Sequence, residues 1–145
     1  PLAGARSLYL GNMRYLAVAS PQFLQRHFAA GLEPSRLAQV PAVVFGRDDR
    51  LQHRYLAALG VEGRFLHHLC PSSEGFVQLL LAGMGWGMVP APQVEAALAS
   101  GRLQVLPGGE VLDVPLYWHH WRNGGELLAQ LTSHLAREAP RHLQA

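Results

Sequence analysis

P-S-S-E-G-F-V-Q-L-L-L-A-G-M-G-W-G-M-V-P, residues 71–90, combines a helix start, an apolar helix and a short strand. Ser72 or Ser73 is a typical helix cap, because a serine hydroxyl accepts a hydrogen bond from a backbone N–H in the first turn. The leucine-rich run that follows predicts a helix buried on most sides, and Gly83 can end it. Trp86 to Val89 predicts a short buried strand. With the strand expected before it, this segment forms a βαβ unit.

The start of this helix is also a candidate binding site for a small anion. The first N–H groups of a helix lack partners within the helix, and the helix dipole places a positive partial charge there. A ligand carboxylate could therefore bind at Ser72 and Ser73. The simpler interpretation, which capping preferences favour, is that the two serines only cap the helix.

Strands and helices alternate along the rest of the chain. We expect strands at residues 13–19, 41–45, 64–70, 103–106 and 114–121, with helices between most of them and a final helix after residue 125. This alternation predicts an α/β sheet with helices on its faces. Ligands of such folds bind at the carboxyl ends of strands, where loops lead into helices. Three loops qualify, namely Ser20–Pro21, Arg47–Asp49 and Pro71–Glu74.

Composition indicates a folded chain. Hydrophobic residues make up 49% of the chain and charged residues 15%, so a folded core is expected. The length of 145 residues is enough for one domain, or for one lobe plus part of another. The net charge of +2 comes from scattered arginines, so no nucleic-acid surface is expected. No apolar run reaches the roughly 18 residues of a membrane-spanning helix, and no signal-peptide pattern is visible. With one cysteine, the expected location is the cytoplasm.

Two acidic residues and an aromatic cluster are the remaining candidates for a binding site. One of Asp48 and Asp49 is expected to cap the helix that follows them, which leaves the other to meet a cationic group of a ligand. Trp118, His119 and Trp121 lie close together in sequence. Part of this cluster should belong to the core, and the rest could line a pocket.

Metal and enzyme chemistry have little support. His67–His68 and His119–His120 lie in expected strands, where neighbouring side chains point to opposite faces and cannot chelate one ion. We therefore expect no metal and no cofactor. Cys70 has no expected base beside it and is interpreted as a small buried thiol. The acids near the strand ends match no catalytic pair, so we expect no enzyme.

Several segments together resemble the effector-binding region of LysR-type transcriptional regulators. In chain order they are M-R-Y-L-A-V-A-S-P-Q-F, P-A-V-V-F-G-R-D-D-R-L-Q-H, the stretch at 71–90, L-A-S-G-R-L and L-D-V-P-L-Y-W-H-H-W. S-S-E-G-F-V and L-Y-W-H resemble more narrowly the lysine- and arginine-responsive branch called ArgP or LysG. The resemblance covers essentially the whole chain.

The resemblance implies the fold of a type 2 periplasmic binding protein, in which two crossover strands join two α/β lobes. Residues 1–18 would be the end of the first lobe and one crossover strand. Residues 19–116 would be the second lobe. Residues 117–145 would be the return crossover and the C-terminal helix of the first lobe. The winged helix-turn-helix and most of the first lobe have no counterpart here, so DNA would be bound only through an absent N-terminal domain.

The resemblance also implies a function. L-lysine or L-arginine would bind between the lobes of a dimeric or tetrameric regulator of basic amino acid export or metabolism genes, and would shift the population of lobe arrangements. Carried over by position, the ligand contacts would be Ser20, Asp48, Asp49, Ser72, Ser73, Trp118 and His119. The paired serines would hold the carboxylate, one aspartate would face the cation, and the last two residues would line the hinge. The alternative is a periplasmic-type solute-binding protein for amino acids.

Overall fold

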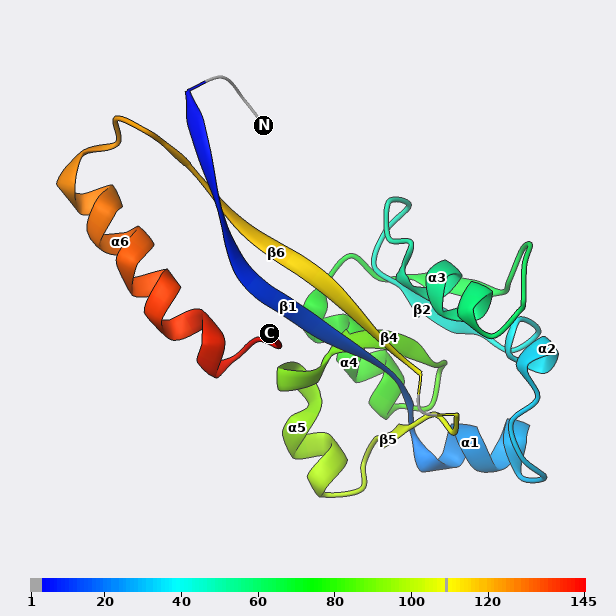
Figure 1. The fold of residues 1–145 in the computed structure, drawn as a ribbon. Coiled ribbons are helices and arrows are strands. Elements are labelled where there is room, and N and C mark those ends of the chain that lie inside the picture. Colours follow the sequence, from blue (N-terminus) through cyan, green and yellow to red (C-terminus); the bar gives the residue numbers. More distant parts are fainter. Residues whose placement is uncertain (1–3, 109) are drawn as a thin grey trace. The chain divides into compact units, whose positions relative to one another are not determined.

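The computed structural model describes residues 4–108 and 110–145 (Figure 1). Its elements in chain order are β1 (Ala5–Ala19), α1 (Pro21–Phe28), α2 (Pro34–Leu37), β2 (Ala42–Val44), α3 (Leu51–Ala58), β3 (His67–Leu69), α4 (Ser73–Leu81), β4 (Gly87–Pro90), α5 (Ala91–Ala99), β5 (Gln104–Val105), β6 (Val111–Trp121), α6 (Gly125–Glu138) and the 3₁₀ turn η1 (Ala139–Arg141).

The chain divides into two compact units. The sheet unit is Tyr15–Leu112, and the ribbon unit combines the residues up to Arg14 with Asp113–Ala145. The long strands β1 and β6 each contribute to both units, since the divisions fall after Arg14 and after Leu112. The lobe boundaries expected from the sequence, after residues 18 and 116, stay a prediction about a larger protein.

Parallel strands form one half of the sheet unit. β2 and β3 pair in parallel, and Trp86 extends this sheet on the other side of β2. The Val43 N–H donates to the Trp86 carbonyl at 2.7 Å, and the Trp86 N–H donates to the Pro41 carbonyl at 3.1 Å. β3, α4 and the strand that begins at Trp86 therefore form the βαβ unit that the sequence predicts, with β2 between its two strands.

β1 joins this sheet in the opposite direction. It pairs antiparallel with β4, with Tyr15 opposite Pro90 and Val18 opposite Gly87. β1 also pairs antiparallel with β5. The end of β1 consequently lies beside the start of β4. The carboxyl ends of β2, β3 and β4 lie at the opposite ends of these strands.

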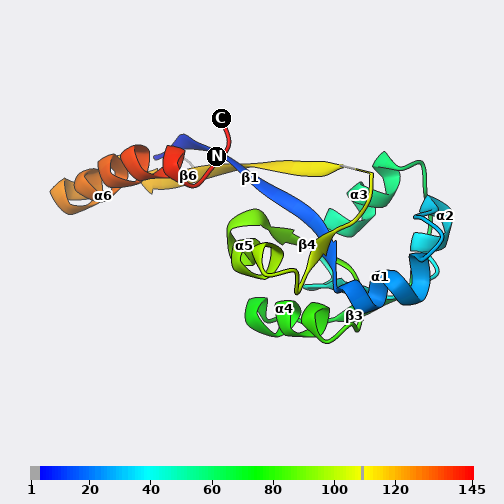
Figure 2. The same cartoon turned by 90° about the horizontal axis from the view of Figure 1, so that it is seen from below.

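Helices cover both faces of the sheet. In β2, Ala42 and Val44 belong to one apolar cluster, and Val43 between them belongs to the other; β1 and β4 divide their residues in the same way, as the period of two in a strand requires. Residues of α1, α2 and α3 complete the first cluster, and residues of α4 and α5 complete the second. Figures 1 and 2 show α4 and α5 next to one another, as their shared cluster requires.

Three local expectations are wrong in detail. α4 fully buries only Phe76 and Leu80, whereas its other apolar residues are half-buried, because one side of the helix faces the sheet and the other faces away. Cys70 is half-buried rather than buried. The first strand begins at Ala5 instead of Met13, because it pairs with β6, which lies about a hundred residues further along the chain.

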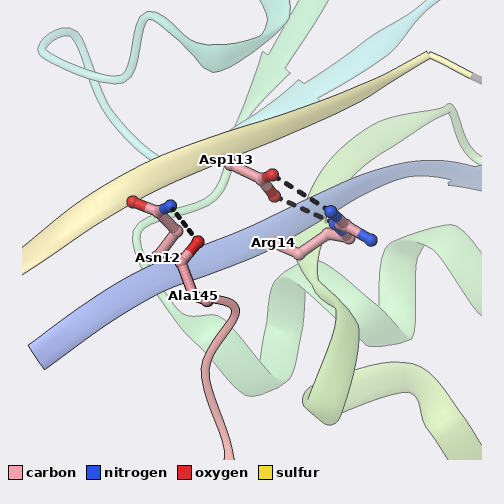
Figure 3. A network of polar contacts seen from close by, with 4 residues as sticks. All are labelled: Asn12, Arg14, Asp113 and Ala145. Carbon is pink, nitrogen blue, oxygen red and sulfur yellow. Dashed lines mark hydrogen bonds and ion pairs between the residues drawn. The ribbon is translucent and has the colours of Figure 1, made fainter. Parts of the chain in front are cut away.

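The ribbon unit contains the paired strands β1 and β6 together with α6. The Trp118 Nε1–H donates to Thr132 Oγ1 at 2.9 Å, which ties β6 to α6. The end of the chain returns to β1, where Asn12 and Gln144 exchange two backbone hydrogen bonds of 2.8 Å. The Asn12 side chain donates to the Ala145 carbonyl at 3.1 Å (Figure 3).

Arg14 on β1 and Asp113 on β6 form a bidentate ion pair in the ribbon unit. Nε lies 2.9 Å from Oδ1, and Nη2 lies 3.1 Å from Oδ2 (Figure 3). The hydrogen bonds from Arg14, reinforced by its charge, hold the pKa of Asp113 below its ordinary value. Each of the two paired strands, β1 and β6, therefore contributes one partner to a charge-assisted contact with fixed geometry.

We expect this ion pair to stabilise the chain less as the solution is acidified. The folded pKa of Asp113 lies below the unfolded one, so the contribution is complete above the unfolded pKa and is lost as the pH falls through the folded pKa. The loss of stability caused by Asp113→Asn, measured by urea denaturation, should therefore shrink toward acid pH. Glu95→Gln, which removes an exposed carboxylate on α5, is measured alongside as the control for the loss of one negative charge. If Asp113→Asn lowered the free energy of unfolding by the same amount at every pH, the stabilising role of the Arg14–Asp113 ion pair would be contradicted.

Candidate functional site

A pocket of about 450 Å³ lies in the sheet unit at the carboxyl ends of β2 and β4. Its wall comes from β1, the loop after β2, the start of α3, the first turn of α4 and the junction of β4 with α5. The lining residues are Tyr15, Phe45, Asp48, Asp49, Leu51, Ser73, Phe76, Met88, Val89, Pro90 and Gln93. The position agrees with the rule that open α/β sheets bind ligands beyond the carboxyl ends of their strands. The volume is within the range of small-molecule sites, about 300–1,000 Å³.

The two serines at the start of α4 have different positions. Ser72 caps the helix, because its Oγ accepts a hydrogen bond from the Gly75 N–H at 3.1 Å. Ser73 is the first helical residue, and it lines the pocket. The Gln93 side chain donates to the Ser73 carbonyl at 3.2 Å, which fixes the start of α4 against α5. Of the two serines, Ser73 is thus the one that the structure places at the pocket.

The two aspartates after β2 also differ. Asp49 Oδ2 accepts from the Phe45 N–H at 3.0 Å, and Asp49 Oδ1 accepts from the Leu51 N–H at 3.1 Å. The cap position of α3 is held by Arg50, which makes no side-chain capping bond, so Asp49 bonds to the first N–H of α3 from one residue earlier. Asp48 is exposed and lines the pocket.

Tyr15 brings a phenol to the pocket wall. Burial raises the pKa of Tyr15, and the negative charge of Asp49 raises it further, so the hydroxyl stays neutral and can donate a hydrogen bond. Sequence reasoning missed Tyr15, Phe45 and Gln93. Phe45 had a local signal, since it ends the expected strand 41–45 beside the acidic loop. Tyr15, in contrast, reaches the pocket only through its antiparallel register opposite Pro90.

Ser20 does not line this pocket, and its expected ligand contact stays a prediction. It is fully buried, and its Oγ accepts from the Phe23 N–H at 3.1 Å as the cap of α1. A Cβ placed on Gly83, just beyond the end of α4, would lie 3.3 Å from this oxygen, whereas Ser73 is at the start of that helix. Ser20 lies away from the pocket because β1 runs antiparallel to β4, which places the carboxyl end of β1 beside the start of β4.

Trp118 and His119 lie in the ribbon unit. Trp118 bonds to Thr132 of α6, and His119 Nδ1 lies 2.7 Å from Ser7 Oγ on the neighbouring strand. Both side chains thus have partners within their own unit. Their expected role at a hinge stays a prediction.

The described residues hold neither a metal-binding cluster nor a membrane-spanning helix. Within residues 4–108 and 110–145, no three His, Cys, Asp or Glu side chains are grouped so that they could hold a metal ion. No helix in the same ranges is long and apolar enough to cross a membrane. The pocket itself brings together the start of α4, aromatic side chains and the Asp48–Asp49 loop.

A family model described as the LysR substrate binding domain matches residues 2–142. The chain belongs to the LysR substrate-binding domain family. This LysR domain is 65% identical over 139 residues to the HTH-type transcriptional regulator ArgP of Pseudomonas aeruginosa (strain UCBPP-PA14). That match covers 96% of this chain and 46% of the regulator, so the chain spans about half the length of the curated relatives it matches.

Solved structures agree with this assignment. The C-terminal domains of a LysR family protein from Agrobacterium tumefaciens superpose with a TM-score of 0.92 at 45% identity, covering 99% of this chain and 70% of that one. Full-length LysG from Corynebacterium glutamicum, solved with its bound effector Arg, superposes with a TM-score of 0.86 at 34% identity, covering 100% of this chain and 50% of LysG. The predicted fold class and the resemblance to the ArgP and LysG branch are confirmed.

Proposed function

We propose that this LysR domain is the effector-sensing part of a DNA-binding transcriptional regulator, and that its pocket receives L-lysine or L-arginine. The observation that supports this most is the pairing of an acidic loop with the start of a helix in one pocket. A basic amino acid carries a carboxylate at one end and a cation at the other, so it needs these two environments together. The arginine bound to LysG, a relative at 34% identity, supports the same ligand class.

Each end of such a ligand meets a complementary group. The carboxylate binds at the first turn of α4, where the Ser73 hydroxyl, free N–H groups and the helix dipole favour negative charge. The side-chain cation binds at the Asp48–Asp49 loop in a charge-assisted contact. Between them, Phe45, Tyr15 and Phe76 offer aromatic and apolar surface to the methylene chain.

The regulatory output belongs to the longer protein that contains this domain. Effector binding stabilises one arrangement of the lobes over another, and the ligand can shift that equilibrium only by its difference in affinity for the two. DNA contact, assembly into dimers or tetramers, control of basic amino acid export or metabolism genes and a cytoplasmic location are parts of this proposal. The relatives named above are regulators, which favours this function over a periplasmic-type solute-binding protein.

Calorimetric titration of the full-length protein tests the proposal. L-lysine or L-arginine should bind with a dissociation constant on the order of micromolar, about −8 kcal/mol, while L-glutamate and L-leucine should not bind. The ligand that binds should also change the mobility or footprint of the protein on its operator DNA. A folded protein that binds neither basic amino acid would contradict the proposed ligand. Binding without any effect on DNA would favour a solute-binding protein.

A further inference from the structure

The carboxylate of Asp49 is held by the backbone of its own loop. Its two oxygens accept from the N–H groups of Phe45 and Leu51, at 3.0 and 3.1 Å. These bonds join the end of β2 to the start of α3, and both donors belong to residues that line the pocket. The side chain is half-buried, so it cannot turn toward a ligand without leaving two backbone donors unpaired, which is costly.

The neighbouring carboxylate of Asp48 is free to turn. It is exposed at the pocket, and within residues 4–108 and 110–145 it has neither a hydrogen-bond partner nor an ion-pair partner. The other polar lining side chains, apart from Asp49, are the uncharged Tyr15, Ser73 and Gln93. Among the described residues of the pocket wall, Asp48 is therefore the acid with both oxygens available to a cation.

We propose that Asp48 is the residue that selects a cationic side chain, and that Asp49 is a positioning residue that holds the loop presenting Asp48. This inference rests on the proposed function, because it concerns the same pocket and the same ligand class. It assigns separate tasks to two adjacent residues of one type, between which the sequence pattern alone leaves the choice open.

The two roles predict different responses to the same chemical change. Asp48→Asn keeps the shape of the side chain and breaks no hydrogen bond or ion pair among the described residues, but it removes the charge that a guanidinium or ammonium group meets. We expect affinity for L-arginine to fall about 10- to 100-fold, as for the loss of a charge-assisted hydrogen bond. Affinity for L-citrulline, which has a neutral urea group in place of the guanidinium, should stay the same or rise.

Asp49→Asn should act on the loop instead. An amide NH₂ replaces one of the acceptor oxygens and faces a backbone N–H, so one hydrogen bond becomes a contact between two donors. We expect a lower thermal midpoint, and a loss of affinity that is of similar size for L-arginine and L-citrulline. The ratio of the two affinities therefore reports ligand selection, whereas a common decrease in both reports the shape of the loop.

The experiment is calorimetric titration of the full-length protein and its variants with L-arginine, L-lysine and L-citrulline, with a thermal melt of each variant. Glu95→Gln is the matched control, since it removes one negative charge from an exposed position of α5 that does not line the pocket. The proposal predicts that only Asp48→Asn changes the arginine-to-citrulline ratio, by at least about tenfold.

Two failures can be told apart. If the unsubstituted protein binds neither arginine nor lysine, the proposed function and this inference both fall. If it binds arginine, and Asp48→Asn keeps that affinity while Asp49→Asn loses the preference for arginine over citrulline, this inference alone is overturned. A change of the same size in Glu95→Gln would also overturn it, because the effect would then come from overall charge.

Discussion

Trp86→Ala is expected to lower the free energy of unfolding of this chain by about 3–5 kcal/mol, the usual cost of deleting a large buried side chain. The indole of Trp86 is fully buried, and its ring centroid lies 5.6 Å from that of Tyr55 on α3. Among the described residues its Nε1–H has no hydrogen-bond partner, so the substitution leaves no other polar group unpaired. The decrease in the free energy of unfolding therefore measures the packing of Trp86 in the core, including its contact with Tyr55 of α3.

Urea denaturation followed by circular dichroism checks this value, with two controls. Trp86→Phe keeps an aromatic ring against Tyr55 and should cost clearly less than Trp86→Ala. Trp121→Ala removes a side chain that is 59% exposed in the ribbon unit, and it should change stability by less than about 0.5 kcal/mol. Equal costs for the phenylalanine and alanine variants at position 86 would show that packing of an aromatic ring against Tyr55 does not carry the effect.

Gly11→Ala is expected to detach the end of the chain from β1. Gly11 has φ +128°, a conformation that strains an L-residue by about 1–3 kcal/mol. A Cβ there would also lie 2.8 Å from the Gln144 carbonyl oxygen and 3.0 Å from Leu143 Cβ. We expect residues 143–145 to move away and relieve this contact, which breaks the hydrogen bonds between Asn12 and the chain end.

Amide hydrogen exchange at Asn12 and Gln144 measures this detachment, since each amide donates to the carbonyl of the other. Both should exchange much faster in Gly11→Ala than in the unsubstituted chain. Gly31→Ala is the control: Gly31 has φ +113°, and a Cβ there would meet nothing within 4 Å. It imposes comparable backbone strain without the collision. Unchanged protection of the two amides in Gly11→Ala would show that β1 yields instead of the chain end.

Features with a local cause could be predicted from the sequence. Ser20 and Ser72 both cap helices as expected, since a hydroxyl before a helix bonds to an N–H three residues later. The order of strands and helices followed from apolar runs between glycine and proline signals. Asp48 and Ser73, which line the pocket, were found because they follow strands in an α/β chain.

Features that depend on partners distant in sequence required the tertiary structure. Periodicity shows that a segment is a strand, but it contains no information on the direction of its neighbour, so the antiparallel pairing of β1 with β4 could not be foreseen. The antiparallel direction of β1 brings Tyr15 to the pocket and places Ser20 away from it. The choice between Asp48 and Asp49 likewise depended on which carboxylate the Phe45 and Leu51 N–H groups engage. The sequence by itself determined the elements, the caps and the kinds of residue at the strand ends; the long-range hydrogen bonds, which no local pattern encodes, decided which of those residues share a site.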